Sequence, residues 1–159
     1  MRFRRGWDEY KQIAFIMKVL FVCRGNVGRS QMAEALFTEY TGIKAFSAGT
    51  KVFKNRNQKI KKISLTEPVI KFMKKEGIDI GKNITTQITP KMIKRFDKII
   101  VMAEPETIPA YLSNNDKIEI WDIKDPKGMS DKDYKKIISQ IKNNIKQFIK
   151  DNNLPNRNS

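Results

Sequence analysis

Residues 19–30 read Val19-Leu20-Phe21-Val22-Cys23-Arg24-Gly25-Asn26-Val27-Gly28-Arg29-Ser30. The first four are apolar, and a short uninterrupted apolar run is typical of a strand buried on both faces. The run ends at Cys23, and a segment with two glycines separates it from Arg29 and Ser30. This order predicts a strand, a turn and a helix start, which together form one βα unit of an α/β protein.

Cys23 stands six residues before Arg29 and is the only cysteine in the chain. Backbone N–H groups in a tight turn, together with the start of a helix, attract anions. Arginine adds a forked, permanently charged donor for two phosphate oxygens. Such positive groups favour the thiolate, which is the nucleophilic form of cysteine. The spacing therefore predicts that Cys23 attacks phosphorus while Arg29 holds the phosphate.

The alternative is that Cys23 is an ordinary small residue of the core, because most free cysteines are buried. Three neighbouring features favour the catalytic interpretation. A strand precedes the loop, Gly25 and Gly28 allow a tight anion-binding turn, and Ser30 can cap the following helix.

The length of 159 residues predicts one domain with a real core. We expect residues 1–16 to be an N-terminal extension outside the core, residues 17–152 to be the domain, and residues 153–159 to be a frayed C-terminal tail. Residues 1–16 lack a continuous apolar segment, so we expect no signal peptide. No apolar stretch approaches the ~20 residues that cross a membrane.

The formal net charge is +15, and the lysines are spread along the whole chain. This spread favours solvated helix faces over a specific acidic partner, and no specific nucleic-acid binding is expected because aromatic residues do not alternate with the lysines. A single cysteine excludes an intrachain disulfide and favours a reducing, cytoplasmic compartment. Without histidine, a zinc site of the usual type is not expected.

Hydrophobic periodicity predicts strands that alternate with helices. The expected strands are residues 18–22, 44–48, 98–102 and 117–121, and the expected helices are residues 30–40, 66–76, 89–95, 106–112 and 130–152. Residues 51–62 are predicted to form a long solvated loop. The alternation predicts a single three-layer α/β domain, in which a four-stranded parallel sheet carries helices on both faces.

Ligands of such sheets bind beyond the carboxyl ends of the strands, where Cys23 is expected to lie. A cysteine nucleophile still needs a proton donor for the leaving oxygen, and with no histidine this donor should be a carboxyl group. Asp122 and Asp125 both follow the fourth strand. Pro126 restricts Asp125 to an extended conformation that can direct its side chain toward the loop. The alternative is an ordinary Asp-Pro surface turn.

From about Met17 to Lys150, the chain resembles the low-molecular-weight protein tyrosine phosphatases, which share their fold with thioredoxin-coupled arsenate reductases. The resemblance rests on residues 19–30, 32–35, 47–50, 76–80, 99–102 and 125–126, in that order. It implies a flavodoxin-like topology. It also implies hydrolysis of phosphate monoesters, protein phosphotyrosine or small aryl phosphates, by a monomer without metal or cofactor.

The resemblance implies a role for each matching residue. Cys23 would become phosphocysteine, Arg29 would hold the equatorial oxygens, and Asp125 would protonate the leaving group and then activate water. Ser30 would donate a hydrogen bond to the thiolate, and Ser47 would support Asn26. The residues assigned to substrate binding are Arg24, Gly25, Asn26, Val27, Gly28 and Ser30.

The chain departs from the family pattern at several positions. Gly28 replaces a frequent second cysteine, which removes a reversible disulfide that shields the nucleophile. Lys127 and Gly128 replace aromatic residues that often follow the Asp-Pro pair, and Asn83 stands where a histidine is frequent. Phe53 is a candidate for a substitute aromatic wall, and the equal alternative is a surface or core residue.

Three other functions remain open at this stage. Arsenate reduction would need an external thiol, because the two further cysteines of the thioredoxin-coupled branch are absent. A phosphocysteine phosphocarrier would not require Asp125. The third alternative is a basic protein that binds nucleic acid without catalysis.

Overall fold

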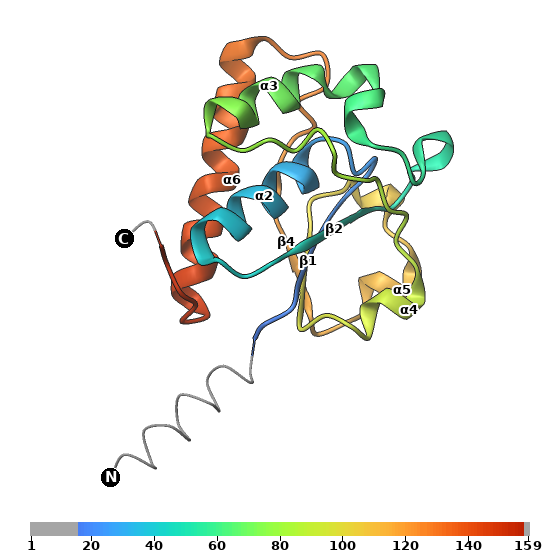
Figure 1. The fold of residues 1–159 in the computed structure, drawn as a ribbon. Helices are drawn as coiled ribbons and strands as arrows, with labels where there is room; N and C mark the ends of the chain where they lie inside the picture. Colours follow the sequence, from blue (N-terminus) through green and yellow to red (C-terminus); the bar gives the residue numbers. More distant parts are fainter. Residues whose placement is uncertain (1–15, 158–159) are drawn as a thin grey trace.

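The computed structural model describes residues 16–157 (Figure 1). Four strands form one parallel sheet in the order β2-β1-β3-β4. Their bounds are β1 Val19–Cys23, β2 Phe46–Gly49, β3 Lys98–Val101 and β4 Ile118–Ile120. The α/β prediction with four parallel strands is confirmed, and the strand boundaries differ from the expected ones by at most two residues at each end.

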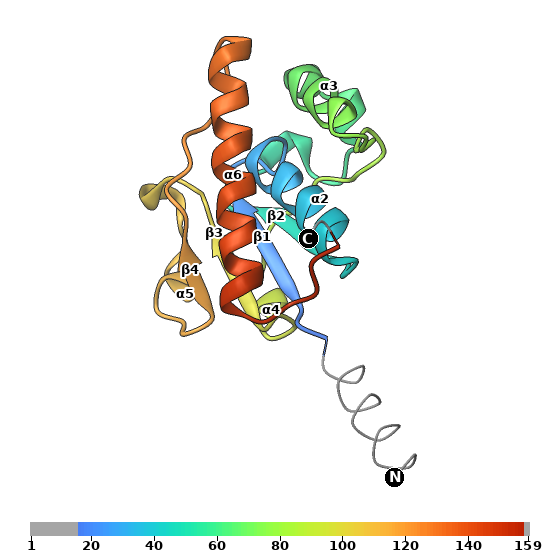
Figure 2. The same cartoon turned by 90° about the vertical axis from the view of Figure 1, so that its left-hand side faces the viewer.

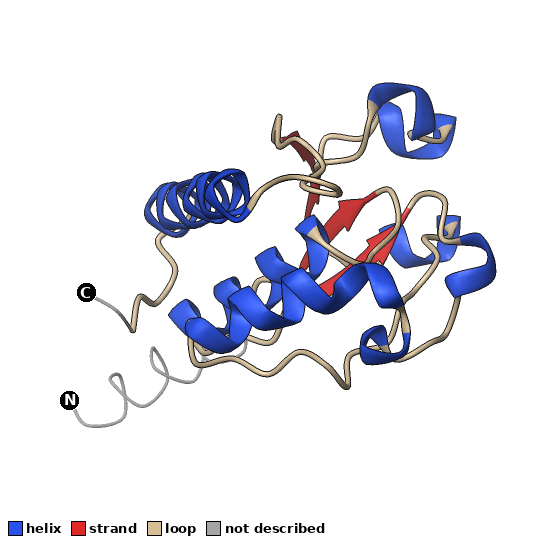
Figure 3. Ribbon diagram, turned by 90° about the horizontal axis from the view of Figure 1, so that it is seen from above, coloured by secondary structure: helices blue, strands red, loops and turns tan. Residues whose placement is uncertain are grey.

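Helices cover both faces of the sheet. Figures 2 and 3 show α2 and α6 side by side on one face, and Figure 1 shows α4 and α5 together on the other. The helices are α2 Arg29–Thr41, α3 Glu67–Lys75, α4 Pro90–Ile93, α5 Ala110–Ser113 and α6 Asp131–Asp151. The predicted three-layer arrangement is therefore present.

The alternation of side chains along β1 divides the core into two parts. Phe21 points toward α2 and α6, where its ring lies 5.7 Å from Phe37 and 5.9 Å from Trp121. Leu20 and Val22 belong to the cluster on the α4–α5 side, with Leu112. Every residue of β1 is almost completely buried, which explains its uninterrupted apolar sequence.

The prediction of a solvated loop at residues 51–62 is confirmed for most side chains, which are exposed, but the segment has more local structure than expected. The segment contains two short 3-10 turns, Phe53–Asn55 and Ile60–Lys62, and a third turn spans Ser64–Thr66. Val52 and Ile60 are buried, and the Thr66 hydroxyl donates to the carbonyl oxygens of Ile60 and Ile63. Val52 and Ile60 are too few apolar residues, in a segment rich in lysine, for the sequence to predict that part of it packs against the core.

The C-terminal tail is ordered as far as the structure describes it. Leu154 packs against the α2–α6 core cluster, and the Arg157 backbone N–H donates to the Tyr40 carbonyl oxygen at 2.6 Å. The expectation of a frayed tail is therefore wrong for residues 154–157. Of the expected N-terminal extension, residues 1–15 lie outside the described residues.

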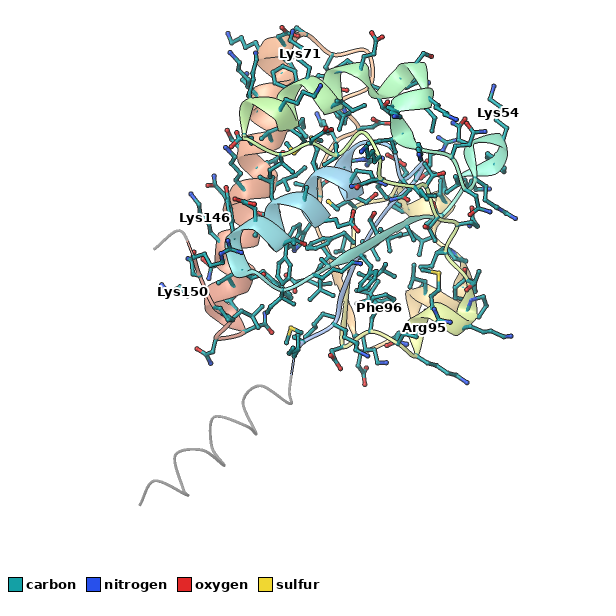
Figure 4. All side chains as sticks on the ribbon, viewed as in Figure 1. Lys54, Lys71, Arg95, Phe96, Lys146 and Lys150 are labelled. Carbon is teal, nitrogen blue, oxygen red and sulfur yellow. The ribbon has the colours of Figure 1, made fainter. Side chains whose placement is uncertain are left out.

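The positive charge is distributed over the surface, as the lysine spread predicted. In Figure 4 the labelled side chains Lys54, Lys71, Lys146 and Lys150 project outward from different parts of the molecule. Among residues 16–157, no helix is long and apolar enough to cross a membrane.

Candidate active site

The loop that joins β1 to α2 lies at the carboxyl end of the sheet, at the upper end of β1 in Figure 1. Its left-handed position is Asn26, with φ of 57°, and neither Gly25 nor Gly28 has a positive φ. The two glycines that were expected to allow the tight turn therefore do not supply its left-handed residue. Asparagine is the residue after glycine that best tolerates the left-handed region, because its short polar side chain can bond locally.

Asn26 is completely buried and is held by four hydrogen bonds. Its Oδ1 accepts from the Thr86 backbone N–H at 2.8 Å, and its carbonyl oxygen accepts from Gln31 Nε2 at 3.1 Å. Its Nδ2 donates to Ser30 Oγ at 2.8 Å and to Ser47 Oγ at 2.9 Å. Asn26 is thus the central brace of the loop, and Ser47 lies where the resemblance placed it.

Asn83, the residue at the frequent histidine position, contributes to the same support. Its Nδ2 donates to Gln31 Oε1 at 3.2 Å, and Gln31 in turn holds the Asn26 carbonyl oxygen. The Asn83 side chain therefore supports the loop indirectly, through the side chain of Gln31.

Ser30 Oγ lies 3.0 Å from Cys23 Sγ. The serine does not cap α2, because the helix begins at Arg29 and its N-terminus has no side-chain cap. The predicted capping role is therefore wrong, whereas the contact with the nucleophile that the resemblance implied is present.

Gly49 allows the end of β2 to lie directly against the loop. The backbone N–H groups of Thr50 and Lys51 donate to the carbonyl oxygens of Cys23 and Arg24, both at 2.9 Å. A Cβ at Gly49 would lie 2.6 Å from the Arg24 carbonyl oxygen and 2.7 Å from Val52 Cγ2. Only glycine fits this approach without displacing the loop.

We expect Gly49→Ala to lower the free energy of unfolding by about 1–3 kcal/mol, because the new methyl group meets backbone on one side and a buried side chain on the other. Urea denaturation measures the change. The control is Gly25→Ala, where a Cβ meets only Val27 Cγ2 at 3.4 Å. Equal destabilisation by the two variants would contradict this account.

Arg29 is buried, with 3% of its surface exposed, and its guanidinium connects the ends of β3 and β4. Nη1 donates to the carbonyl oxygens of Met102 at 2.6 Å and Ile123 at 3.0 Å. Nη2 pairs with Glu104 Oε1 at 2.9 Å. Since a guanidinium has five N–H donors, these bonds leave Nε–H and one Nη2–H as a fork for an oxyanion.

Glu104 is a site residue that sequence reasoning missed. It follows β3 on the same rim as Cys23, so the rule that places ligands at the carboxyl ends of strands could have identified it. Its Oε1 holds Arg29, and its Oε2 is buried with no hydrogen-bond partner among residues 16–157.

One pocket contains Cys23, Arg29 and Asp125. Cys23 is 2% exposed, and that small surface opens into the pocket. Asp125 Oδ1 accepts from the Lys127 backbone N–H at 3.0 Å, and its Oδ2 lies 3.9 Å from Arg29 Nη2. Asp122, the other candidate acid, lines a different cavity with Lys124 and Met129.

The pocket walls differ from the expected ones. Leu65, Val69 and Tyr134 supply apolar surface, and Lys127 lies at the edge. Tyr134 stacks on Phe72 with ring centroids 5.3 Å apart, and burial together with nearby Asp125 raises the pKa of its hydroxyl. Phe53 is 66% exposed and does not line the pocket, so the proposed aromatic wall is not present there.

The remaining loop residues have distinct positions. Gly25, Val27 and Gly28 line the pocket, whereas the Arg24 side chain is exposed and lies outside it. Arg24 therefore contributes to the loop through its backbone. Among the described residues, no three Asp, Glu, His or Cys side chains lie close enough together to hold a metal ion.

A profile of the low molecular weight phosphotyrosine protein phosphatases matches residues 18–157. The chain belongs to this family. The crystal structure of a low molecular weight protein tyrosine phosphatase from T. tengcongensis is 28% identical, with a TM-score of 0.70, and the match covers 86% of this chain and 99% of that one. The loop from Cys23 to Ser30 lies within the residues that this profile matches.

Relatives named for a different reaction also match this phosphatase-family chain. Arsenate reductase 2 of Staphylococcus saprophyticus is 30% identical over 134 residues, which covers 82% of this chain and 94% of the relative. A thioredoxin-dependent arsenate reductase of Corynebacterium glutamicum shares the fold, with 24% identity and a TM-score of 0.64 over 86% of this chain and 61% of that one. The comparisons establish the family and do not decide between phosphate ester hydrolysis and arsenate reduction.

Proposed function

We propose that this chain hydrolyses phosphate monoesters, with phosphotyrosine in proteins as the main substrate class, through a phosphocysteine intermediate. The observation that carries the proposal is that Cys23, Arg29 and Asp125 line one pocket, with Ser30 Oγ 3.0 Å from Cys23 Sγ. These are a nucleophile, an oxyanion fork and a carboxyl group, which are the three parts that covalent phosphoryl transfer requires.

In the first step the phosphoryl oxygens bind to the loop N–H groups and to the free fork of Arg29. Cys23 Sγ attacks phosphorus as the bond to the ester oxygen breaks. Protonated Asp125 gives its proton to that oxygen, and the alcohol or phenol leaves. Because Arg29 is held by β3 and β4, its donors are positioned before the substrate arrives.

In the second step water attacks the phosphorus atom of phosphocysteine. Asp125, now ionised, accepts a proton from that water while the sulfur–phosphorus bond breaks. The sulfur leaves as a thiolate and accepts the hydrogen bond from Ser30. Release of inorganic phosphate returns the enzyme to its starting state.

The second candidate is arsenate reduction, which the arsenate reductase relatives favour. Reduction of arsenate to arsenite requires two electrons, and thiols supply them by forming a disulfide. Cys23 is the only cysteine, so this chain cannot form that disulfide within itself and would depend on an external thiol. Arsenate-dependent consumption of glutathione, at rates above those for aryl phosphate hydrolysis, would favour this second function.

The absence of aromatic residues after Asp125-Pro126 bears on the choice of substrate. Lys127 lies at the edge of the pocket, while Leu65 and Tyr134 supply its apolar surface. A phenyl ring can therefore be received by side chains from other elements, and Lys127 adds a positive charge beside it. These features support, as the substrate, an aryl phosphate that has a further negative charge near its ring.

We expect Asp125→Asn to lower kcat for phosphotyrosine hydrolysis by about 10²–10⁴-fold, because the amide cannot donate the proton that the phenolate needs. The loss should be smaller for para-nitrophenyl phosphate, whose leaving group needs less protonation. Steady-state kinetics with both substrates measure the difference.

The matched control is Asp122→Asn, because this aspartate follows the same strand but lines a separate cavity. We expect its kcat to stay within about twofold of the wild-type value, as is typical of surface substitutions. Wild-type turnover by Asp125→Asn would contradict the general-acid assignment.

A further inference from the structure

Glu34 lies one helical turn beyond Ser30 on α2, and the proposed mechanism does not use it. Its carboxyl group is partly buried and borders a cavity that shares no lining residue with the Cys23 pocket. Glu34 Oε2 accepts a hydrogen bond from Ser47 Oγ at 3.3 Å. Through Ser47 it is connected to the phosphate-binding loop.

The direction of each hydrogen bond in this connection follows from its neighbours. The Thr86 N–H fixes Asn26 Oδ1 as an acceptor, so Asn26 Nδ2 supplies both hydrogens, one to Ser30 and one to Ser47. A serine hydroxyl has one hydrogen of its own. When Cys23 is a thiolate it has no hydrogen, so Ser30 donates to Cys23 Sγ, and Ser47 donates to Glu34.

The Asn26 amide thus stands between two groups that can each carry a negative charge, the Cys23 thiolate and the Glu34 carboxylate. Each group is reached through one serine. A negative charge on Glu34 polarises the amide toward Ser47 and repels an anion at the loop. A neutral Glu34 keeps the hydrogen bond from Ser47 without this competing charge.

We propose that Glu34 is a positioning residue of the phosphate-binding loop, which ends the hydrogen-bond chain from Cys23 and, through its charge, sets how strongly the loop binds an anion. This role deepens the proposed hydrolysis and rests on it for its biological meaning. The effect of Glu34 on anion binding by the loop can be measured without any reaction.

The surroundings of Glu34 place its ionisation in the neutral range. Burial raises the pKa of its carboxyl group from 4.5 to about 7, against the smaller opposing effects of the Ser47 hydrogen bond and Lys44. The other charged side chains that face the cavity are Glu39 of α2 and Asp79 of the segment after α3, and both carry negative charge. Lys44 is therefore the single cation among the residues that line this cavity.

The test uses Glu34→Gln, because glutamine retains an oxygen that accepts from Ser47 but never ionises. Sulfate is the probe, since it is tetrahedral and does not change charge between pH 5.5 and pH 8.5. We expect the ratio of the wild-type Kd to the Glu34→Gln Kd to be near one at pH 5.5 and to reach about fivefold at pH 8.5. The ratio of kcat/KM values for para-nitrophenyl phosphate should change in parallel.

The stability of the two proteins provides an independent readout. The pKa of Glu34 is higher in the folded state than in the unfolded state, so the folded protein binds the extra proton. The wild type should therefore lose stability relative to Glu34→Gln as pH rises from about 4.5 to about 7, with no further change above that range. Urea denaturation at several pH values measures this difference.

The control is Glu39→Gln, which removes a carboxylate from the same helix and cavity but from outside the hydrogen-bond chain. It should leave the pH dependence of sulfate binding like that of the wild type. Glu34→Ala, which also removes the acceptor for Ser47, should bind sulfate more weakly than Glu34→Gln at every pH. If that variant does not fold, Glu34→Gln alone decides.

A sulfate Kd ratio that stays at one across the pH range, for a folded Glu34→Gln protein, would overturn the role of Glu34. A wild type that binds sulfate with the expected pH dependence but hydrolyses no phosphate ester would leave this role standing and refute the proposed hydrolysis. Absence of sulfate binding by the wild type would overturn both.

Discussion

Cys23→Ser is expected to lower kcat for para-nitrophenyl phosphate by at least about 10⁴-fold, which is the scale of loss when a covalent nucleophile is removed. Serine is of similar size, and its hydroxyl can still meet Ser30 Oγ, so the loop should keep its shape. The variant loses only the thiolate, which a hydroxyl at neutral pH cannot replace without a neighbouring base. Steady-state kinetics measure the effect.

Two controls separate loss of chemistry from loss of fold. Thermal unfolding of Cys23→Ser should resemble that of the wild type, and the variant should still bind sulfate, because Arg29 and the loop N–H groups remain. A Cys23→Ser protein with wild-type turnover would refute covalent catalysis by sulfur. A protein that fails to bind sulfate would show that the loop itself depends on the thiol.

Arg29→Lys is expected to lower kcat by about 10²–10³-fold although the positive charge is kept, as when one oxyanion donor is removed from an active site. The guanidinium spans Met102, Ile123 and Glu104 and still presents a fork to the substrate. An ammonium group has three donors on one atom and cannot make these bonds and hold two phosphate oxygens together. Single-turnover kinetics measure the first step directly.

The matched control is Arg95→Lys, because Arg95 is exposed and lies away from the pocket (Figure 4). Its kcat should stay within about twofold of the wild-type value. A kcat for Arg29→Lys that also stays within about twofold of the wild-type value would mean that Arg29 contributes only its charge, and would contradict the assignment of a forked donor.

The sequence placed two residues of the candidate site from local spacing and a third from the sheet topology. Cys23 and Arg29 belong to one strand–loop–helix unit, so their spacing along the chain fixes their positions relative to each other. Asp125 could be placed because parallel strands end on a common edge, which brings the segment after β4 toward the segment after β1. Of the two positions open for Phe53, the structure shows the surface one, a choice that depends on packing far along the chain.

The residues that the sequence did not reveal depend on contacts between distant segments. Tyr134 reaches the pocket from α6, and Leu65 reaches it from a 3-10 turn. Glu104 acquires its role only because Arg29 lies beside it in the fold. Asn26 rather than a glycine takes the left-handed position, because Thr86, which lies 60 residues later, holds its side chain.

The most direct test of the central claim is to trap the covalent intermediate. Wild-type protein is mixed with excess phosphotyrosine and quenched in acid within milliseconds, and the digested peptides are weighed by mass spectrometry. The account predicts that the peptide with Cys23 carries one added phosphoryl group, and that this group is absent from Cys23→Ser. Rapid release of phosphate with no phosphorylated Cys23 peptide at any quench time would contradict it.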